Sequence, residues 1–104
     1  MAARLTLHWT PIAADHLRAA YEYVSQDNEP AADALVDRIF AAIEMLERYP
    51  QIGRAGRVKR TRELVVAGTP YVVVYRMRRA QIDILAIFHG AGNGRNDSSR
   101  KVRP

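Results

Sequence analysis

The chain has 104 residues, no cysteine and a formal net charge of +5. This length suits one two-layer domain, without a separate regulatory module, and the absence of cysteine excludes disulfides, thiolate zinc sites and cysteine nucleophiles. No apolar run approaches the roughly 18 residues of a membrane-spanning helix, and the amino end lacks the apolar core of a signal peptide. We therefore expect a cytoplasmic protein.

The charge is divided unevenly about Gly53. Residues 1–52 carry four Lys/Arg and eight Asp/Glu, a net charge of −4, whereas residues 53–104 carry twelve and three, a net charge of +9. The basic half favours a polyanionic partner such as nucleic acid, or an acidic protein surface. A solvated basic face that aids solubility explains the same asymmetry about equally well.

The amino-terminal residues predict a strand followed by a helix. Apolar and polar side chains alternate over residues 5–9, as in a half-buried strand. Thr10 then supplies an N-cap and Pro11 a first helical residue. An apolar stripe continues the helix to about Gln26.

A second amphipathic helix follows almost at once. Pro30 marks its first turn, and its apolar stripe ends near Tyr49, because Pro50 disfavours a helical residue before it. So short a link between two amphipathic helices predicts an antiparallel helical hairpin, with both stripes facing one layer.

That layer is predicted from the rest of the chain. Residues 63–67, 71–77 and 82–88 are rich in Val, Ile and Tyr and are joined by short turns. They predict a three-stranded antiparallel meander, and the fold class is therefore α+β, in the order β-α-α-β-β-β. Within the middle strand Val72, Val74 and Arg76 share the face opposite Tyr71, Val73 and Tyr75, so the sheet offers a second, partly apolar surface.

The sequence changes character after His89. Residues 91–104 are small, polar and cationic without periodicity, which predicts a flexible basic tail on a single domain of residues 1–90.

A cationic loop precedes the meander and is the first candidate binding site. Arginine forks recognise phosphate or carboxylate best when a rigid element aims them. The candidate target-binding residues are Arg54, Arg57, Lys59, Arg60, Arg62 and, at the end of the next strand, Arg76.

Metal and nucleotide sites are not expected. His8, His16 and His89 lie in three different elements without a carboxylate cluster. The segment that contains Gly53 and Gly56 lacks the lysine and the hydroxyl residue of a phosphate-binding loop. We expect no metal and no cofactor.

Arg62, Arg76 and His89 form the candidate catalytic set. If they converge with a tyrosine of the middle strand, two guanidiniums could hold a phosphodiester while the histidine moves a proton. A purely structural interpretation is simpler: Arg62 pairs with Glu63 or Asp83, and His89 caps a strand end.

Several motifs together resemble the ParE/RelE superfamily of toxins from bacterial type II toxin–antitoxin modules. The resemblance covers about residues 5–92 and rests on Trp9-Thr-Pro, the helix exit at 50–54, and the strands at 62–66, 70–76 and 82–90. It implies a helical hairpin on a small antiparallel sheet and a cognate antitoxin that wraps the toxin in a hetero-oligomer.

The resemblance implies one of two activities. RelE-like members are ribosome-dependent mRNA endoribonucleases, which would make Arg62, Arg76 and His89 catalytic. ParE-like members inhibit DNA gyrase without established catalytic residues. The ending after His89, small residues followed by Asn and Arg, is more similar to the ParE branch. The leading hypothesis is therefore a non-enzymatic gyrase inhibitor that causes growth arrest; the alternatives are the mRNA endoribonuclease and a degenerate, non-toxic binding module.

Overall fold

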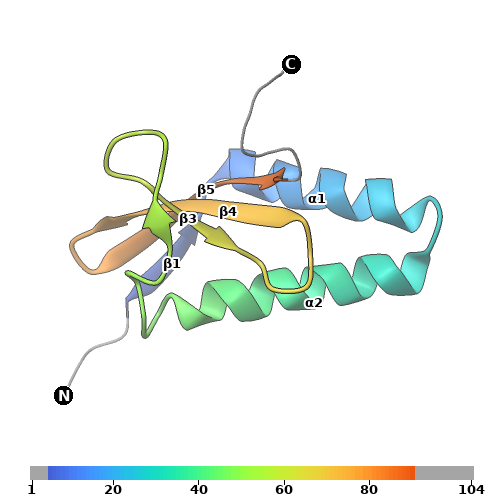
Figure 1. Cartoon of the computed structure of the whole chain (residues 1–104), viewed down its shortest axis with the longest axis horizontal. Coiled ribbons are helices and arrows are strands. Elements are labelled where there is room, and N and C mark those ends of the chain that lie inside the picture. Colours follow the sequence, from blue (N-terminus) through green and yellow to red (C-terminus); the bar gives the residue numbers. More distant parts are fainter. Residues whose placement is uncertain (1–4, 91–104) are drawn as a thin grey trace.

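The computed structural model describes residues 5–90 and has an α+β fold (Figure 1). Its elements are β1 (Thr6–Trp9), α1 (Pro11–Ser25), α2 (Glu29–Met45), β2 (Arg54–Ala55), β3 (Arg62–Val65), β4 (Tyr71–Arg78) and β5 (Gln81–His89). The helical hairpin and the meander predicted from the sequence are confirmed. The predicted tail at 91–104 lies outside the described residues.

One sheet contains every strand, in the order β1-β5-β4-β3-β2. The meander of β3, β4 and β5 is antiparallel, whereas β1 pairs in parallel with β5. The helical hairpin is the connection that lets β1 lie beside the last strand in the same direction. The two-residue strand β2, which pairs with β3, was not predicted because so short a segment carries no periodicity.

Both helices begin with the caps that their sequences indicate. The Thr10 hydroxyl accepts a hydrogen bond from the Ala13 N–H at 3.2 Å and donates one to the Ile84 carbonyl at 2.7 Å, so it also fastens α1 to β5. Asn28 caps α2 by accepting from the Ala31 N–H at 3.0 Å.

The second helix ends earlier than predicted, at Met45 rather than near Tyr49. Its last turn tightens to hydrogen bonds between residues three apart, such as Leu46 N–H to the Ile43 carbonyl at 2.9 Å. This tightening satisfies orphan carbonyls at a helix end and buries Leu46 completely.

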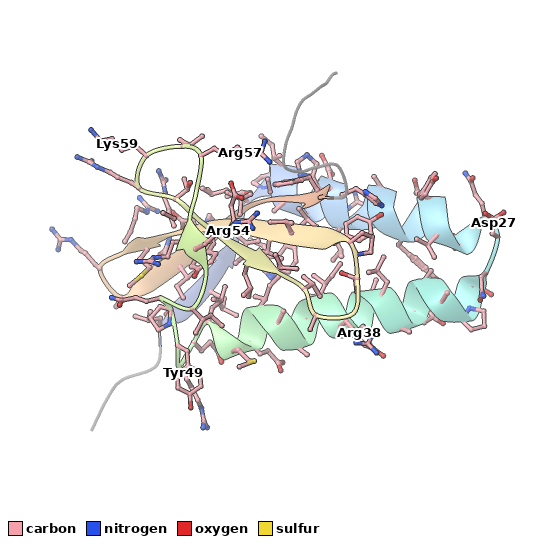
Figure 2. The ribbon with its side chains drawn as sticks, viewed as in Figure 1. Asp27, Arg38, Tyr49, Arg54, Arg57 and Lys59 are labelled. Carbon is pink, nitrogen blue, oxygen red and sulfur yellow. The ribbon has the colours of Figure 1, made fainter. Side chains whose placement is uncertain are left out.

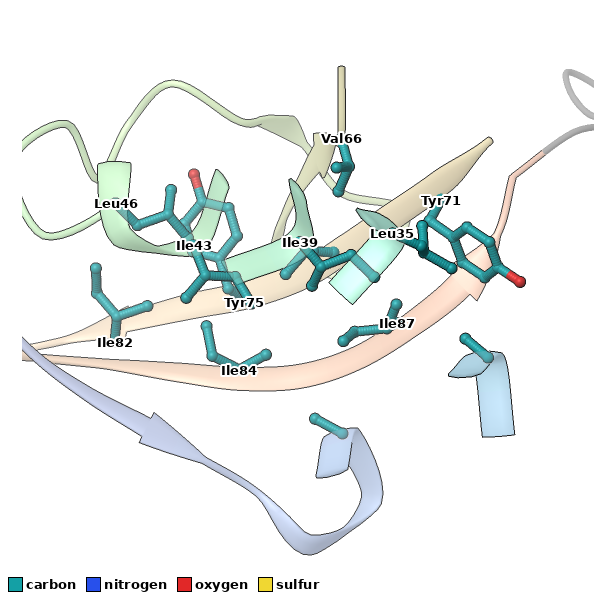
Figure 3. Packing of buried hydrophobic residues seen from close by; sticks show 13 residues of the cluster. Leu35, Ile39, Ile43, Leu46, Val66, Tyr71, Tyr75, Ile82, Ile84 and Ile87 are labelled. Carbon is teal, nitrogen blue, oxygen red and sulfur yellow. The ribbon is translucent and has the colours of Figure 1, made fainter. Parts of the chain in front are cut away.

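The core lies between the helices and one face of the sheet. Ile39 and Ile43 of α2 belong to the same buried cluster as Tyr75 and Ile84 of the sheet (Figure 3). The burial of each large apolar side chain contributes about 1.5–3 kcal/mol to stability. This face of the sheet therefore serves to stabilise the fold. No helix within residues 5–90 is long and apolar enough to cross a membrane.

Candidate target-binding face

The other face of the sheet, which we call the open face, carries charged groups beside apolar ones. Cross-strand pairs share a face, and the pairs Glu63 with Val74, Arg76 with Asp83, and Val72 with Phe88 all lie opposite the helices. Two of these side chains, Glu63 and Asp83, are the buried charged groups of the described chain. Each carboxylate lies at the centre of a separate cluster of arginine residues.

The Asp83 cluster contains four polar side chains around one carboxylate that is only 1% exposed. Its oxygens lie 2.6 Å from Gln81 Nε2, 2.7 Å from Arg78 Nε, 3.0 Å from Arg76 Nε and 3.2 Å from His8 Nδ1. The Gln81 amide, followed by both arginines and His8, holds the pKa of Asp83 well below its ordinary value, although burial opposes this. Asp83 is therefore a charged anchor for the arginines.

The Glu63 cluster fastens the cationic loop to the sheet. Arg54 Nη2 donates to Glu63 Oε1 at 3.1 Å, and the Arg57 backbone N–H donates to Oε2 at 3.2 Å. The Arg57 guanidinium lies 5.8 Å from the centre of the Phe88 ring, a cation–π distance. The loop of residues 54–61 thus folds over part of the open face and partly covers its apolar surface.

Exposed cations crowd this part of the molecule. Lys59 and Arg60 project from the loop, and Figure 2 shows Lys59 far from Asp27, which lies in the turn between the helices. Among the described residues, the cationic loop is therefore separated in space from the acidic turn between the helices. An acidic partner is steered towards the loop and away from the helical turn.

Arg62 lies on the helix-facing side instead. It pairs across the strands with Tyr75, and its Nη1 donates to the carbonyls of Gln51 at 3.2 Å and Gly53 at 2.7 Å. These bonds hold the segment that leaves α2. The predicted partners Glu63 and Asp83 bind Arg54, Arg76, Arg78 and His8, and not Arg62.

His89 is the last residue of β5 and lies opposite Tyr71, the first residue of β4, with a ring-centroid distance of 5.3 Å. Tyr71 and Tyr75 are about 13 Å apart along the strand. His89 and Arg62 thus sit at opposite ends of the helix-facing side, and Arg76 lies on the open face. The structure does not bring the three candidate catalytic residues together.

Sequence reasoning missed the Asp83 cluster as a unit, including His8, Arg78 and Gln81. The available signal was the alternation of Arg76 and Arg78 in a strand, opposite the single acidic residue of the following strand. The described residues 5–90 contain no group of His, Cys, Asp and Glu that could hold a metal ion.

A second apolar surface lies along the helical hairpin. Trp9 and Phe40 meet edge to face at 5.6 Å, and they line a groove of about 500 Å³ together with Leu17, Val36 and other residues of α1 and α2. Arg18 is the charged residue among those that line it, and it pairs with Asp15 at 2.7 Å. At the same groove the Tyr21 hydroxyl donates to Asp33 at 3.0 Å. The groove is therefore mainly apolar with charges of both signs at its edge, which suits an amphipathic segment.

The Tyr75 hydroxyl yields a first prediction. It accepts from the Gly53 N–H at 2.9 Å and donates to the Pro50 carbonyl at 2.8 Å, and burial raises its pKa. Tyr75→Phe leaves both backbone groups without a hydrogen-bond partner, so we expect the free energy of unfolding to fall by about 1–3 kcal/mol. Urea titration measures this; the exposed Tyr23→Phe should be neutral, and equal midpoints for the two variants would contradict the assignment.

Comparison with known proteins matches this sequence and fold to one class, small toxins of toxin–antitoxin modules. Residues 7–94 match the family model described as the ParE toxin of the type II toxin–antitoxin system parDE. The chain therefore belongs to the ParE toxin family.

Three relatives agree with this placement. The chain is 40% identical over 87 residues to Y4kP of Sinorhizobium fredii, described as a candidate toxin, covering 84% of this chain and 90% of the relative. It is 35% identical over 83 residues to the toxin RelE2 of Caulobacter vibrioides, covering 80% and 92%. A solved chain of a chromosomal ParDE toxin–antitoxin system from P. aeruginosa superposes with a TM-score of 0.75 at 27% identity, covering 85% of this chain and 98% of that one.

Proposed function

We propose that this toxin inhibits DNA gyrase by direct contact through the cationic loop and the open face. One observation carries the proposal: the arginines around Asp83 and Glu63 are fixed by buried carboxylates yet remain about half exposed, as binding groups do. The candidate acid–base set is dispersed, which favours inhibition by binding over bond cleavage. The contact residues are Arg54, Arg57, Lys59, Arg60 and Arg76, with Arg62 supporting the loop from the other side.

We assign the antitoxin to the groove between α1 and α2. Its mainly apolar lining, with charged groups of both signs at the edge, suits an amphipathic antitoxin segment. The family and the ParDE neighbour support an antitoxin partner. With the antitoxin on the helices, the open face is a separate surface.

A ribosome-dependent endoribonuclease is the second candidate, because the relative from Caulobacter vibrioides carries the name RelE2. It requires Arg62, Arg76 and His89 to act on one phosphodiester, which would need substrate binding to rearrange them.

Expression of the chain without an antitoxin, in cells with a DNA-damage reporter, separates these candidates. Gyrase inhibition predicts growth arrest with induction of the reporter and intact transcripts, reversed by co-expression of the antitoxin. Codon-phased mRNA cleavage without induction would instead support the endoribonuclease. Unimpaired growth would indicate a non-toxic binding module.

A further inference from the structure

The turn between β4 and β5 holds an arginine in an unfavourable backbone conformation. Arg79 is the first of two residues that join the pair Arg78 and Gln81, and its φ is +48°. Glycine, asparagine and aspartate are the usual residues in this left-handed region. Within residues 5–90 the only other non-glycine residue with positive φ is Arg60, on the cationic loop.

The residue before this turn is aimed by the Asp83 anchor. Arg78 binds the carboxylate through Nε at 2.7 Å and keeps its side chain 54% exposed. Arg76, about 7 Å away on the same face of the strand, binds through Nε at 3.0 Å and is 44% exposed. Arg78 Nη2 also lies 3.5 Å from Asp83 Oδ1, so the carboxylate binds this guanidinium side-on. Both guanidiniums nevertheless stay about half exposed, and their N–H groups that do not bind Asp83 are available to a ligand.

A cleft lies at the same turn. It has a volume of about 450 Å³ and is lined by Thr6, Arg78, Arg79, Ala80 and Gln81. Two guanidiniums border it, and none of its lining residues within 5–90 is acidic. The Asp83 carboxylate already binds Arg78, so Arg79 supplies the further positive charge that makes the cleft receptive to an anion. The Thr6 hydroxyl adds a neutral hydrogen-bonding group, whereas Gln81 Nε2 is already bonded to Asp83 at 2.6 Å.

The surroundings of this cleft favour a protein over a nucleic acid. Between the Asp83 cluster and Arg57 the open face presents the partly buried apolar side chains of Val74, Ala86 and Phe88. A phosphate backbone has no apolar group to cover such a strip, whereas a protein segment with acidic and apolar residues covers both parts.

We propose that the β4–β5 turn is a carboxylate-binding site, in which Arg78 and Arg79 receive an acidic side chain of the target protein and Asp83 acts as a positioning residue. As a part of the target contact it rests on the proposed function. This role accounts for an arginine at a position where glycine or asparagine would suit the backbone better: the positive charge of Arg79 is needed for binding, at some cost in backbone strain.

Arg79→Asn separates binding from stability. Asparagine suits the left-handed conformation, so the melting temperature should stay the same or rise by about 2–4 °C. The toxin concentration that half-inhibits gyrase should increase about 5–50-fold, as expected for the loss of a charge-assisted contact. The control Arg48→Asn removes one exposed charge after α2 and should change neither quantity by more than about twofold. Unchanged inhibition by Arg79→Asn would overturn the proposal.

A peptide titration tests the ligand chemistry without gyrase. The probe is acetyl-Gly-Glu-Gly-Glu-Gly-amide, added to the full chain while backbone and arginine Nε–H signals are followed by NMR. We expect shifts concentrated at Arg78, Arg79 and Gln81, much smaller shifts with the matching glutamine peptide, and loss of the response in Arg79→Asn. Equal responses to both peptides, shifts spread evenly over all arginines, or a stronger response at this turn to a DNA hexanucleotide would each reject a carboxylate site. If gyrase is not inhibited at all, the proposed function fails while this titration still decides the site.

Discussion

Asp83→Asn lowers the free energy of unfolding by about 2–4 kcal/mol. The substitution removes the negative charge from a buried carboxylate that has four polar partners, and hydrogen bonds to charged groups are worth more than neutral ones. It also leaves the positive charges of Arg76 and Arg78 close together without a negative charge between them, so they repel each other. Urea unfolding followed by circular dichroism measures the loss.

The exposed pair of Asp15 and Arg18 provides the matched control. Its Nη1–Oδ1 distance is 2.7 Å, as short as the bonds in the Asp83 cluster, but both side chains are more than half exposed. Asp15→Asn should therefore cost less than about 1 kcal/mol. Similar losses in the two variants would show that the buried cluster is not a special anchor.

The pH dependence follows from the depressed pKa of Asp83. The folded carboxylate binds a proton less readily than the unfolded one, whose ordinary value is 3.8. Its contribution is complete above that pH and is lost progressively as the pH falls below it, because protons then favour the unfolded chain. Wild-type stability should thus fall more steeply between pH 5 and pH 2 than that of Asp83→Asn. Parallel curves would contradict this.

The proposed function predicts that a variant with a neutral loop no longer inhibits gyrase but keeps its fold. The combined variant replaces Arg57 and Lys59 by Gln and Arg60 by Asn, three exposed residues whose side chains form no ion pair within residues 5–90. Each loses an electrostatic contact with the target, so the half-inhibiting toxin concentration should rise at least about 100-fold. The inhibition curve is measured with purified gyrase and relaxed plasmid.

Antitoxin binding is the internal control for this variant, because the groove at Trp9 and Phe40 lies on the helices. We expect affinity for the antitoxin within about threefold of wild type. The variant Arg18→Gln with Arg48→Gln removes charges from the helical half and should inhibit gyrase normally. Loss of inhibition in both variants would mean that net charge and not the loop governs the contact, and retention in both would mean that the loop cations are not needed for it.

The elements were predictable because their signals are local. Thr10 with Pro11 and, for the second helix, Pro30 mark the helix starts, and alternating apolar residues mark the strands. The arrangement of the site residues was harder to predict from the sequence. Arg62 and Arg76 do lie on paired strands, with Arg62 opposite Tyr75. They do not converge, because Tyr75 and Arg76 are neighbours in one strand and point to opposite faces. Nothing in the sequence showed that carbonyls of the helix exit bind Arg62.

The partners of Asp83 depended on tertiary structure for the same reason. His8 reaches Asp83 because β1 pairs in parallel with β5, with His8 opposite Asp83, although two helices and three strands separate β1 from β5 in the sequence. The sequence had suggested Asp83 as an ion-pair acceptor, but for Arg62. The correct arginines are those whose strand positions place them on the open face.

The most direct test is the supercoiling activity of purified gyrase with the wild-type toxin and the neutralised loop variant in stoichiometric excess. Inhibition by wild type, its loss in the loop variant and its relief by antitoxin are the predicted results. Normal supercoiling in the presence of excess wild-type toxin would contradict the proposal that this protein acts on gyrase through its arginine-rich face.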